Sequence, residues 1–193
     1  MLSLQEFRNG LQKQMPNGTD RPFLCSGNPL AATIFLVGLN PATSLNGSFW
    51  DYWDDETGLD RAKFLSDYRA RKPIRGVRAR LERIVAHLQG EPALETNIHS
   101  VATKRATDLK NEDKNCDAFR YLFDAILPKI VFLHSNGPIR FFESELNEKI
   151  PENKLHSAFW GGHNFKIYAR KGPLFRAKFS EADEIGDKLR GWA

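Results

Sequence analysis

Cysteine is scarce in this chain of 193 residues, which contains only Cys25 and Cys116. Two cysteines so far apart exclude a zinc ribbon, a CxxC redox pair and a four-cysteine iron–sulfur cluster. A chain of this length buries enough surface to fold without disulfide or metal staples. We therefore expect residues 1–193 to form one domain that binds no metal and no cofactor and acts as a monomer.

Long apolar runs are missing as well. No run approaches the roughly 20 residues needed to cross a bilayer. The N-terminus, MLSLQEFRNGLQKQ, is amphipathic and lacks the apolar core of a signal peptide. The sequence therefore predicts a helical extension over residues 1–20 and a cytoplasmic protein without a membrane partner.

Several catalytic motifs are also absent. The chain has no GxSxG nucleophile elbow, and no GxGxxG follows its first apolar segment. His134, His156 and His163 lack the close spacing of a metal motif such as HExxH. These absences argue against a serine hydrolase, a dinucleotide-binding enzyme and a metal site.

Charge of one sign is concentrated in separate parts of the chain. The 28 lysines and arginines nearly balance the 24 aspartates and glutamates, so the net charge is +4. Residues 61–83, however, carry nine basic side chains against two acidic ones, and residues 51–60 carry five acidic side chains and no basic one. A basic segment is either solvated surface or a surface for a polyanion, and the sequence leaves both readings open.

The apolar pattern predicts strands alternating with helices. The predicted strands are residues 33–38, 93–101, 129–134 and 164–170. The predicted helices are residues 74–88, 119–126, 139–146 and 182–192. This alternation indicates an α/β fold with a parallel sheet and helices on both faces. Ligands of such sheets bind beyond the carboxyl ends of the strands, so the site is expected in the loops that follow the four strands.

Asparagines stand near the ends of the first two predicted strands. Asn40 follows Gly38 and Leu39, and Asn97 lies in the second strand. A carboxamide offers a donor and an acceptor there, although asparagine at such a place is also ordinary turn chemistry. Residues 43–60 form a long irregular segment, which is typical of functional loops. Its aromatic side chains are Phe49, Trp50, Tyr52 and Trp53.

Three segments, in chain order, resemble motifs of the uracil-DNA glycosylase superfamily. They are VGLNPAT (37–43), LETNIHSVAT (94–103) and FWGGHNFKIYARKGPLFR (159–176). The first is similar to the Gly-x-Asn-Pro motif of the mismatch-specific and single-strand-selective branches. The second is similar to the asparagine-bearing strand of the thermostable branch. The resemblance runs from residue 21 to residue 192.

This resemblance implies a fold and an activity. The fold is a three-layer αβα sandwich with a central four-stranded parallel sheet. The activity is that of a DNA glycosylase in base-excision repair, which flips uracil or a related damaged base out of DNA and hydrolyses its N-glycosidic bond. The partner implied is DNA that contains uracil or damage.

The chain departs from the superfamily at the second motif. Arg170, Lys171 and Gly172 stand where the family has His-Pro-Ser or Asn-Pro-Ser. Ala42 replaces the glycine that usually follows the proline of the first motif, and the four cluster cysteines of the thermostable branch are absent. A guanidinium stays protonated and cannot copy a neutral histidine, so the resemblance leaves catalytic activity open.

The resemblance also implies roles for individual residues. Asn40 would be catalytic, because the family's asparagine orients the attacking water. The base-binding residues would be Gly38, Leu39, Phe49, Asn97 and Arg170. Among them, Asn97 would pair with O4 and N3–H of uracil, and Phe49 would stack on the base, with Trp50, Tyr52 or Trp53 as alternatives. Arg170 would hold an anionic O2 or a flanking phosphate, or it would exclude the base.

The basic segments predict a DNA-binding surface, whose candidate residues are Arg75, Arg78, Lys171 and Arg176. The acidic segment 51–60 would repel phosphate if it folded over the pocket, and Asp51 or Asp54 would then be placed to assist the water. Two other functions remain open: a non-catalytic nucleic-acid-binding module on the same fold, and a small-molecule enzyme that acts on a nucleoside or nucleotide.

Overall fold

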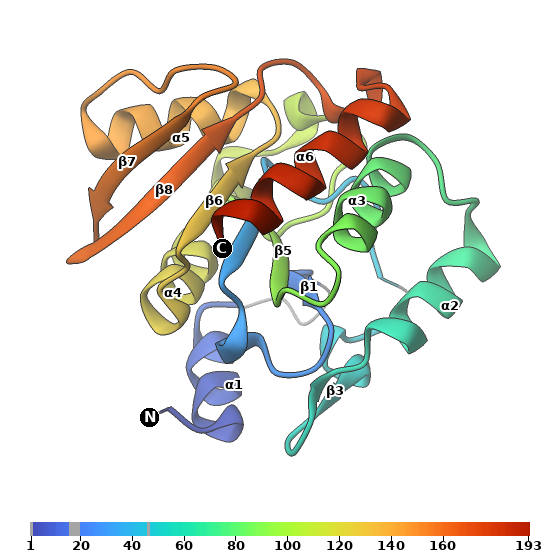
Figure 1. The fold of residues 1–193 in the computed structure, drawn as a ribbon. Helices are drawn as coiled ribbons and strands as arrows, with labels where there is room; N and C mark the ends of the chain where they lie inside the picture. The colour runs from blue at the N-terminus through green and yellow to red at the C-terminus, as the bar shows by residue number, and fades with distance from the viewer. Residues whose placement is uncertain (1, 16–19, 46) are drawn as a thin grey trace.

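The computed structural model describes residues 2–15, 20–45 and 47–193. Its centre is a six-stranded sheet with the order β1-β5-β2-β6-β8-β7 (Figure 1). The strands are β1 (Phe23–Cys25), β2 (Ile34–Gly38), β5 (Ala93–Asn97), β6 (Ile130–Leu133), β7 (Leu155–Trp160) and β8 (His163–Ala169). A separate hairpin is formed by β3 (Trp53–Asp54) and β4 (Gly58–Leu59).

The sheet is mostly parallel. β5, β2, β6 and β8 correspond to the four predicted strands, and each pairs in parallel with the next in the sheet. β1 and β7 add an antiparallel strand at each edge, so the sheet has six strands where four were expected. The sequence did not predict the two edge strands, because β1 has only 3 residues and β7 lacks a clear apolar pattern.

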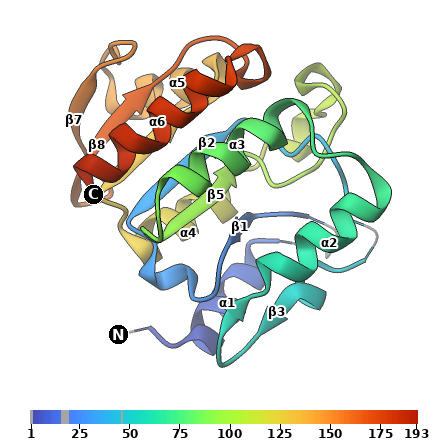
Figure 2. The same ribbon diagram turned by 45° about the vertical axis from the view of Figure 1, so that its right-hand side comes forward.

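Helices cover both faces of the sheet. Their bounds are α1 (Leu4–Lys13), α2 (Arg61–Arg71), α3 (Gly76–His87), α4 (Asp117–Ile126), α5 (Asn136–Leu146) and α6 (Phe179–Trp192). α3 and α6 lie side by side on one face, and α4 and α5 lie on the other (Figures 1 and 2). Gly186 permits the close approach of α3 and α6, because a Cβ there would lie 2.7 Å from the carbonyl oxygen of Ile84.

Alternate residues of the central strands enter two apolar cores, as the two-residue period of a strand requires. Ile34 and Leu36 pack in one core with the buried residues of α3 and α6. Phe35 and Val37 pack in the other with those of α1 and α4. The strands are therefore apolar throughout because both faces are covered.

Two N-terminal regions differ from their expected form. α1 covers Leu4–Lys13 of the predicted extension and is an integral part of the core, since Phe7 and Leu11 are fully buried. Residues 16–19 of that prediction lie outside the described residues. α2 was not predicted because its many charges hide a buried stripe that includes Phe64 and Tyr68. Among the described residues, no helix combines the length and apolarity needed to cross a bilayer.

Candidate functional site

A cavity of about 370 Å³ lies at the carboxyl ends of the parallel strands. Gly38 and Asn97, the last residues of β2 and β5, line it together with His134, which follows β6. Pro173 and the residues after it line it from the loop beyond β8. Each of the four loops named from the sequence therefore contributes to one cavity, in the size range of about 300–1,000 Å³ found for ligand pockets.

Gly38 allows the polar groups of the cavity to converge. It pairs with Asn97 across β2 and β5. A Cβ on Gly38 would lie 2.5 Å from Asn97 Oδ1 and 2.9 Å from His134 Cε1. Both side chains therefore occupy the space above the glycine, and any larger residue would displace them.

The Asn97 carboxamide is open to a ligand. It lines the cavity and makes no side-chain hydrogen bond to any residue that the structure describes. Its neighbour is held in place, because the Thr96 hydroxyl donates to the Pro22 carbonyl oxygen at 2.7 Å. Asn97 thus presents a free donor and a free acceptor from a rigid strand end.

Asn40 also lines the cavity, but its amide nitrogen is already engaged. Nδ2 donates to Thr103 Oγ1 at 2.8 Å and to the Pro41 carbonyl oxygen at 3.2 Å. Thr103 is fixed in turn, since its backbone N–H donates to the same Pro41 oxygen and its hydroxyl donates to Arg105. Oδ1 of Asn40 accepts no hydrogen bond within the described chain, so it remains an acceptor for a water or a ligand.

His134 is a residue whose role in the cavity the sequence did not predict. It is 8% exposed. Burial lowers the pKa of its imidazole to about 4, with the nearby charge of Arg78 acting in the same direction. The ring is therefore neutral near pH 7. The signal available in the sequence was its position as the last residue of the third predicted strand, at the edge where the site was expected.

The aromatic residue predicted to stack on a base is not at the cavity. Phe49 is 1% exposed and packs against Phe23 with ring centroids 5.0 Å apart. Phe23 and Tyr68 line the cavity instead. Leu39 lines it as expected and packs closely over Gly137. Phe49 turned inward because the irregular segment forms a short buried turn, which its composition did not reveal.

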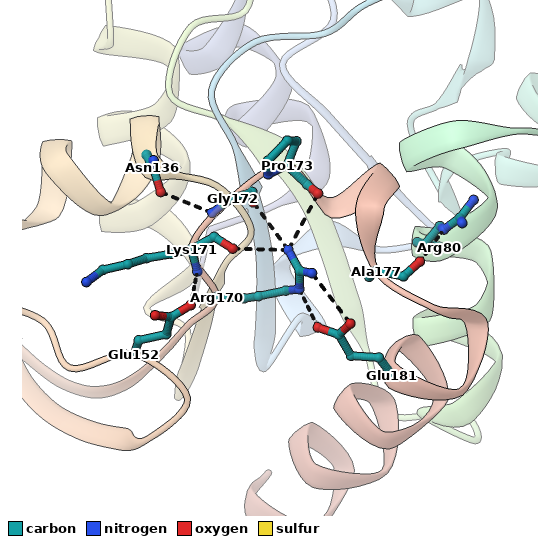
Figure 3. A network of polar contacts seen from close by, with 9 residues as sticks. All are labelled: Arg80, Asn136, Glu152, Arg170, Lys171, Gly172, Pro173, Ala177 and Glu181. Atoms are coloured by element: carbon teal, nitrogen blue, oxygen red, sulfur yellow. Dashed lines mark hydrogen bonds and ion pairs between the residues drawn. The ribbon is translucent and has the colours of Figure 1, made fainter.

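Arg170 is committed to holding the loop after β8 (Figure 3). Its Nε donates to Glu181 Oε1 at 2.5 Å, and its Nη1 donates to the carbonyl oxygens of Lys171 and Gly172 at 3.1 and 3.3 Å. It is not among the cavity-lining residues. The sequence interpretation placed Arg170 against the base, but the structure places its guanidinium on Glu181 of α6, outside the cavity lining.

Arg78 is likewise removed from the predicted DNA-binding surface. It is 7% exposed and donates to Glu95 at 2.6 Å and to Glu82 at 3.0 Å. Arg61 bonds to the same two carboxylates. Burial alone would raise the pKa of Glu95, but the charges of Arg78 and Arg61 outweigh it and lower that pKa to about 2. Arg78 and Glu95 both line the cavity, where they form a buried ion pair.

The other predicted DNA-binding residues are exposed: Arg75, Lys171 and Arg176. Arg176 lies beside Phe175, a cavity-lining residue that is 50% exposed. Lys104 adds a further cation that lines the cavity. Exposed cations therefore remain near the cavity without Arg78.

The acidic segment 51–60 contributes no residue to the cavity lining. Asp51 closes the short turn that begins at Ser48, and Asp54 accepts backbone hydrogen bonds within its own hairpin. Asp55 pairs with Arg8 of α1 at 3.1 Å. Neither Asp51 nor Asp54 is placed to assist a water in the cavity, because neither lines it.

No family model and no curated protein matches this chain. Within the described ranges, no group of three or more histidine, cysteine, aspartate or glutamate side chains is placed to hold a metal ion. The fold and the site together define the protein as a mixed α/β protein with a mostly parallel sheet and, at the carboxyl ends of its strands, a largely apolar cavity into which a few polar side chains converge.

Proposed function

We propose that this protein is a DNA glycosylase that hydrolyses the N-glycosidic bond of uracil or a related damaged base flipped out of DNA. The proposal includes the uracil-DNA glycosylase fold, whose four parallel strands would correspond to β5, β2, β6 and β8. The observation that carries it is the free Asn97 carboxamide, which meets the neutral ring of His134 above Gly38 in the cavity.

Asn97 is the residue that reads the base. Its amide N–H donates to O4 of uracil and its Oδ1 accepts from N3–H. Cytosine presents a donor where uracil presents O4, so the same carboxamide disfavours it. Phe23 or Tyr68 supplies the ring against which the base lies, because both line the cavity.

The hydrolysis needs a positioned water and a group that stabilises the departing base. Asn40 Oδ1 accepts a hydrogen bond from the water, whose oxygen forms the new bond to C1′. The bond from C1′ to the base nitrogen breaks and its electron pair stays on the base, while the water's proton passes to solvent. The neutral His134 ring donates its N–H to the anionic O2 of the base. In this proposal His134 takes the role that the resemblance gives to Arg170, whose guanidinium is bound to Glu181.

Base release from oligonucleotides tests the function. Single- and double-stranded oligonucleotides that contain uracil, hypoxanthine, xanthine or a thymine mismatch are incubated with the protein, and the free base released is measured. We expect release of uracil or a related base, with a rate at least about 100-fold lower in Asn40→Ala, as for other groups that act in the transition state. Arg140→Gln, an exposed change on α5, is the matched control. Absence of release from every substrate contradicts the proposal.

A non-catalytic nucleic-acid-binding module is the second candidate. It is favoured by the ion pair of Arg170 with Glu181. Arg170, Lys171 and Gly172 stand at the family's second motif, and none of them lines the cavity. This candidate predicts salt-sensitive DNA binding that survives Asn40→Ala, without base release.

A further inference from the structure

Arg21 is a cation at one end of the cavity that no role above uses. It precedes β1, and its backbone N–H donates to the Ser100 carbonyl oxygen at 3.2 Å. Since Phe23 pairs with Thr96 in the antiparallel register of β1 and β5, Arg21 lies just beyond the carboxyl end of β5. It lines the cavity together with Asn97, the last residue of that strand.

The Arg21 guanidinium has no anionic partner among the residues that the structure describes. Within the described chain it makes no ion pair and no side-chain hydrogen bond, and it contacts Phe64 with its Cζ 5.6 Å from the ring centroid. Burial lowers its pKa to about 10, so it remains a cation near neutral pH. A guanidinium packed by its face on an aromatic ring keeps its N–H edge free for bidentate binding of an anion.

The neighbouring charges leave Arg21 in excess. Arg61 and Arg78 are neutralised by Glu82 and Glu95 through four contacts of 2.6–3.0 Å. The charges of Arg78 and Glu95 act on the pKa of Arg21, but Arg21 forms an ion pair with neither Glu82 nor Glu95. The cluster therefore holds one more cation than anion. Arg21 is partly exposed and lines the cavity, so an anion that enters the cavity can reach it and balance this excess of positive charge.

The position of Arg21 indicates which part of a ligand carries the anion. The proposed base site lies above Gly38 on β2, and Arg21 lies just before β1, which is two strands away in the order β1-β5-β2. Two strand spacings amount to roughly 10 Å. That distance accommodates a pentose and a phosphate beyond a base.

We propose that Arg21 binds the phosphate of a nucleotide whose base lies against Asn97 and His134. This inference rests on the base site of the proposed function and adds its phosphate subsite. Phosphate is the anion of choice, because a bidentate guanidinium matches its geometry and every nucleotide carries it. The phosphate belongs either to a free nucleotide or to the flipped nucleotide of DNA.

Calorimetric titration with dUMP and with 2′-deoxyuridine tests the inference. We expect the wild-type protein to bind dUMP about tenfold or more tightly than deoxyuridine, as a charge-assisted hydrogen bond provides. Arg21→Gln abolishes this preference and Arg21→Lys retains part of it. Arg140→Gln keeps it in full. Far-UV circular dichroism and a melting curve show that each variant is folded.

The inference is overturned if wild type binds the two ligands equally, or if folded Arg21→Gln keeps the full preference. A uracil-containing oligonucleotide distinguishes the two sources of phosphate. Equal weakening of dUMP and oligonucleotide binding by Arg21→Gln assigns the subsite to DNA, and weakening of dUMP binding alone assigns it to a free nucleotide.

Failure of the proposed function gives a different result. An Arg21-dependent preference for dUMP without base release from any oligonucleotide retains the phosphate subsite and removes the glycosylase activity. Base release without an Arg21-dependent preference for dUMP retains the glycosylase activity and removes the phosphate subsite.

Discussion

At the scale of single residues, the groups that the cavity offers to a ligand are those of side chains that bond to no other part of the protein. Asn97 presents its carboxamide to the cavity because no other residue that the structure describes forms a hydrogen bond with it, whereas the Arg170 guanidinium is bound to Glu181. Both residues stand near the carboxyl ends of strands, and their positions alone do not distinguish them. A strand end sets where a side chain starts, and its tertiary partners set where it points.

Gly38→Ala is expected to damage the site more than the fold. The added Cβ would lie 2.5 Å from Asn97 Oδ1, the end of a side chain that can rotate away into the cavity. We expect dUMP binding to fall about tenfold, the loss of roughly one hydrogen bond, while stability to urea changes by about 1 kcal/mol or less.

Gly191→Ala is the control for that change, since a Cβ there meets nothing within 4 Å. Alanine in a helix stabilises by up to about 1 kcal/mol relative to glycine, so this variant should bind as wild type does and be no less stable. Gly38→Ala with wild-type binding would show that the glycine does not position Asn97.

At the scale of elements, the N-terminal helix supports the cavity wall. Phe7 of α1 is fully buried, and its ring centroid lies 6.0 Å from that of Phe23, which lines the cavity. Ser3 caps the helix through a reciprocal hydrogen-bond pair with Glu6. The amphipathic N-terminal sequence predicted the helix, but only packing on α4 shows that it belongs to the core.

Phe7→Ala should lower the free energy of unfolding by about 3–5 kcal/mol, as large-to-small changes of buried phenylalanine do. Gln5→Ala, an exposed change on the same helix, should cost less than about 0.5 kcal/mol. Urea denaturation measures both. Equal small effects would mean that α1 is a detachable extension.

At the scale of the whole molecule, the net charge of +4 combines two populations of charge. Arg61, Arg78, Glu82 and Glu95 form a mostly buried network that joins α2, α3 and β5. Other cations, among them Arg75 and Arg176, lie exposed. The basic segment 61–83 is therefore partly structural, and its charge count overstates the surface available to a polyanion.

Acid should destabilise the protein in two stages. Unfolded His134 binds a proton below its ordinary pKa of 6.5, but burial delays this in the folded protein to about pH 4. Unfolded Glu95 binds one below 4.5, but the Arg78 and Arg61 charges hold its folded pKa at about 2. In each window the unfolded state binds more protons, so stability falls as pH falls.

Denaturant titrations between pH 7 and pH 2 measure this effect. His134→Gln should reduce the loss of stability between pH 6.5 and 4, and Glu95→Gln should reduce the loss below pH 4.5. Glu95→Gln should also cost about 3–5 kcal/mol at pH 7, because it breaks a buried ion pair. Unchanged pH profiles in both variants would show that neither group carries the acid sensitivity.

The sequence by itself determined the central strands, most helices and the edge of the sheet where the cavity opens. Apolar periodicity is a local property, and the carboxyl ends of parallel strands must meet at one edge. Apolar periodicity therefore located Asn40 and Asn97 at strand ends, and the family resemblance added Gly38 and Leu39.

Only the tertiary structure decided the remaining members of the site. Phe23 of the short antiparallel edge strand β1 and Arg21 just before it line the cavity, and Phe49 is buried in the core. Arg78 is paired with glutamates from β5 and its own helix. Whether a charged or aromatic side chain faces a ligand depends on the residues distant in the sequence that can also contact it. Those residues come within reach only when the helices and strands pack together.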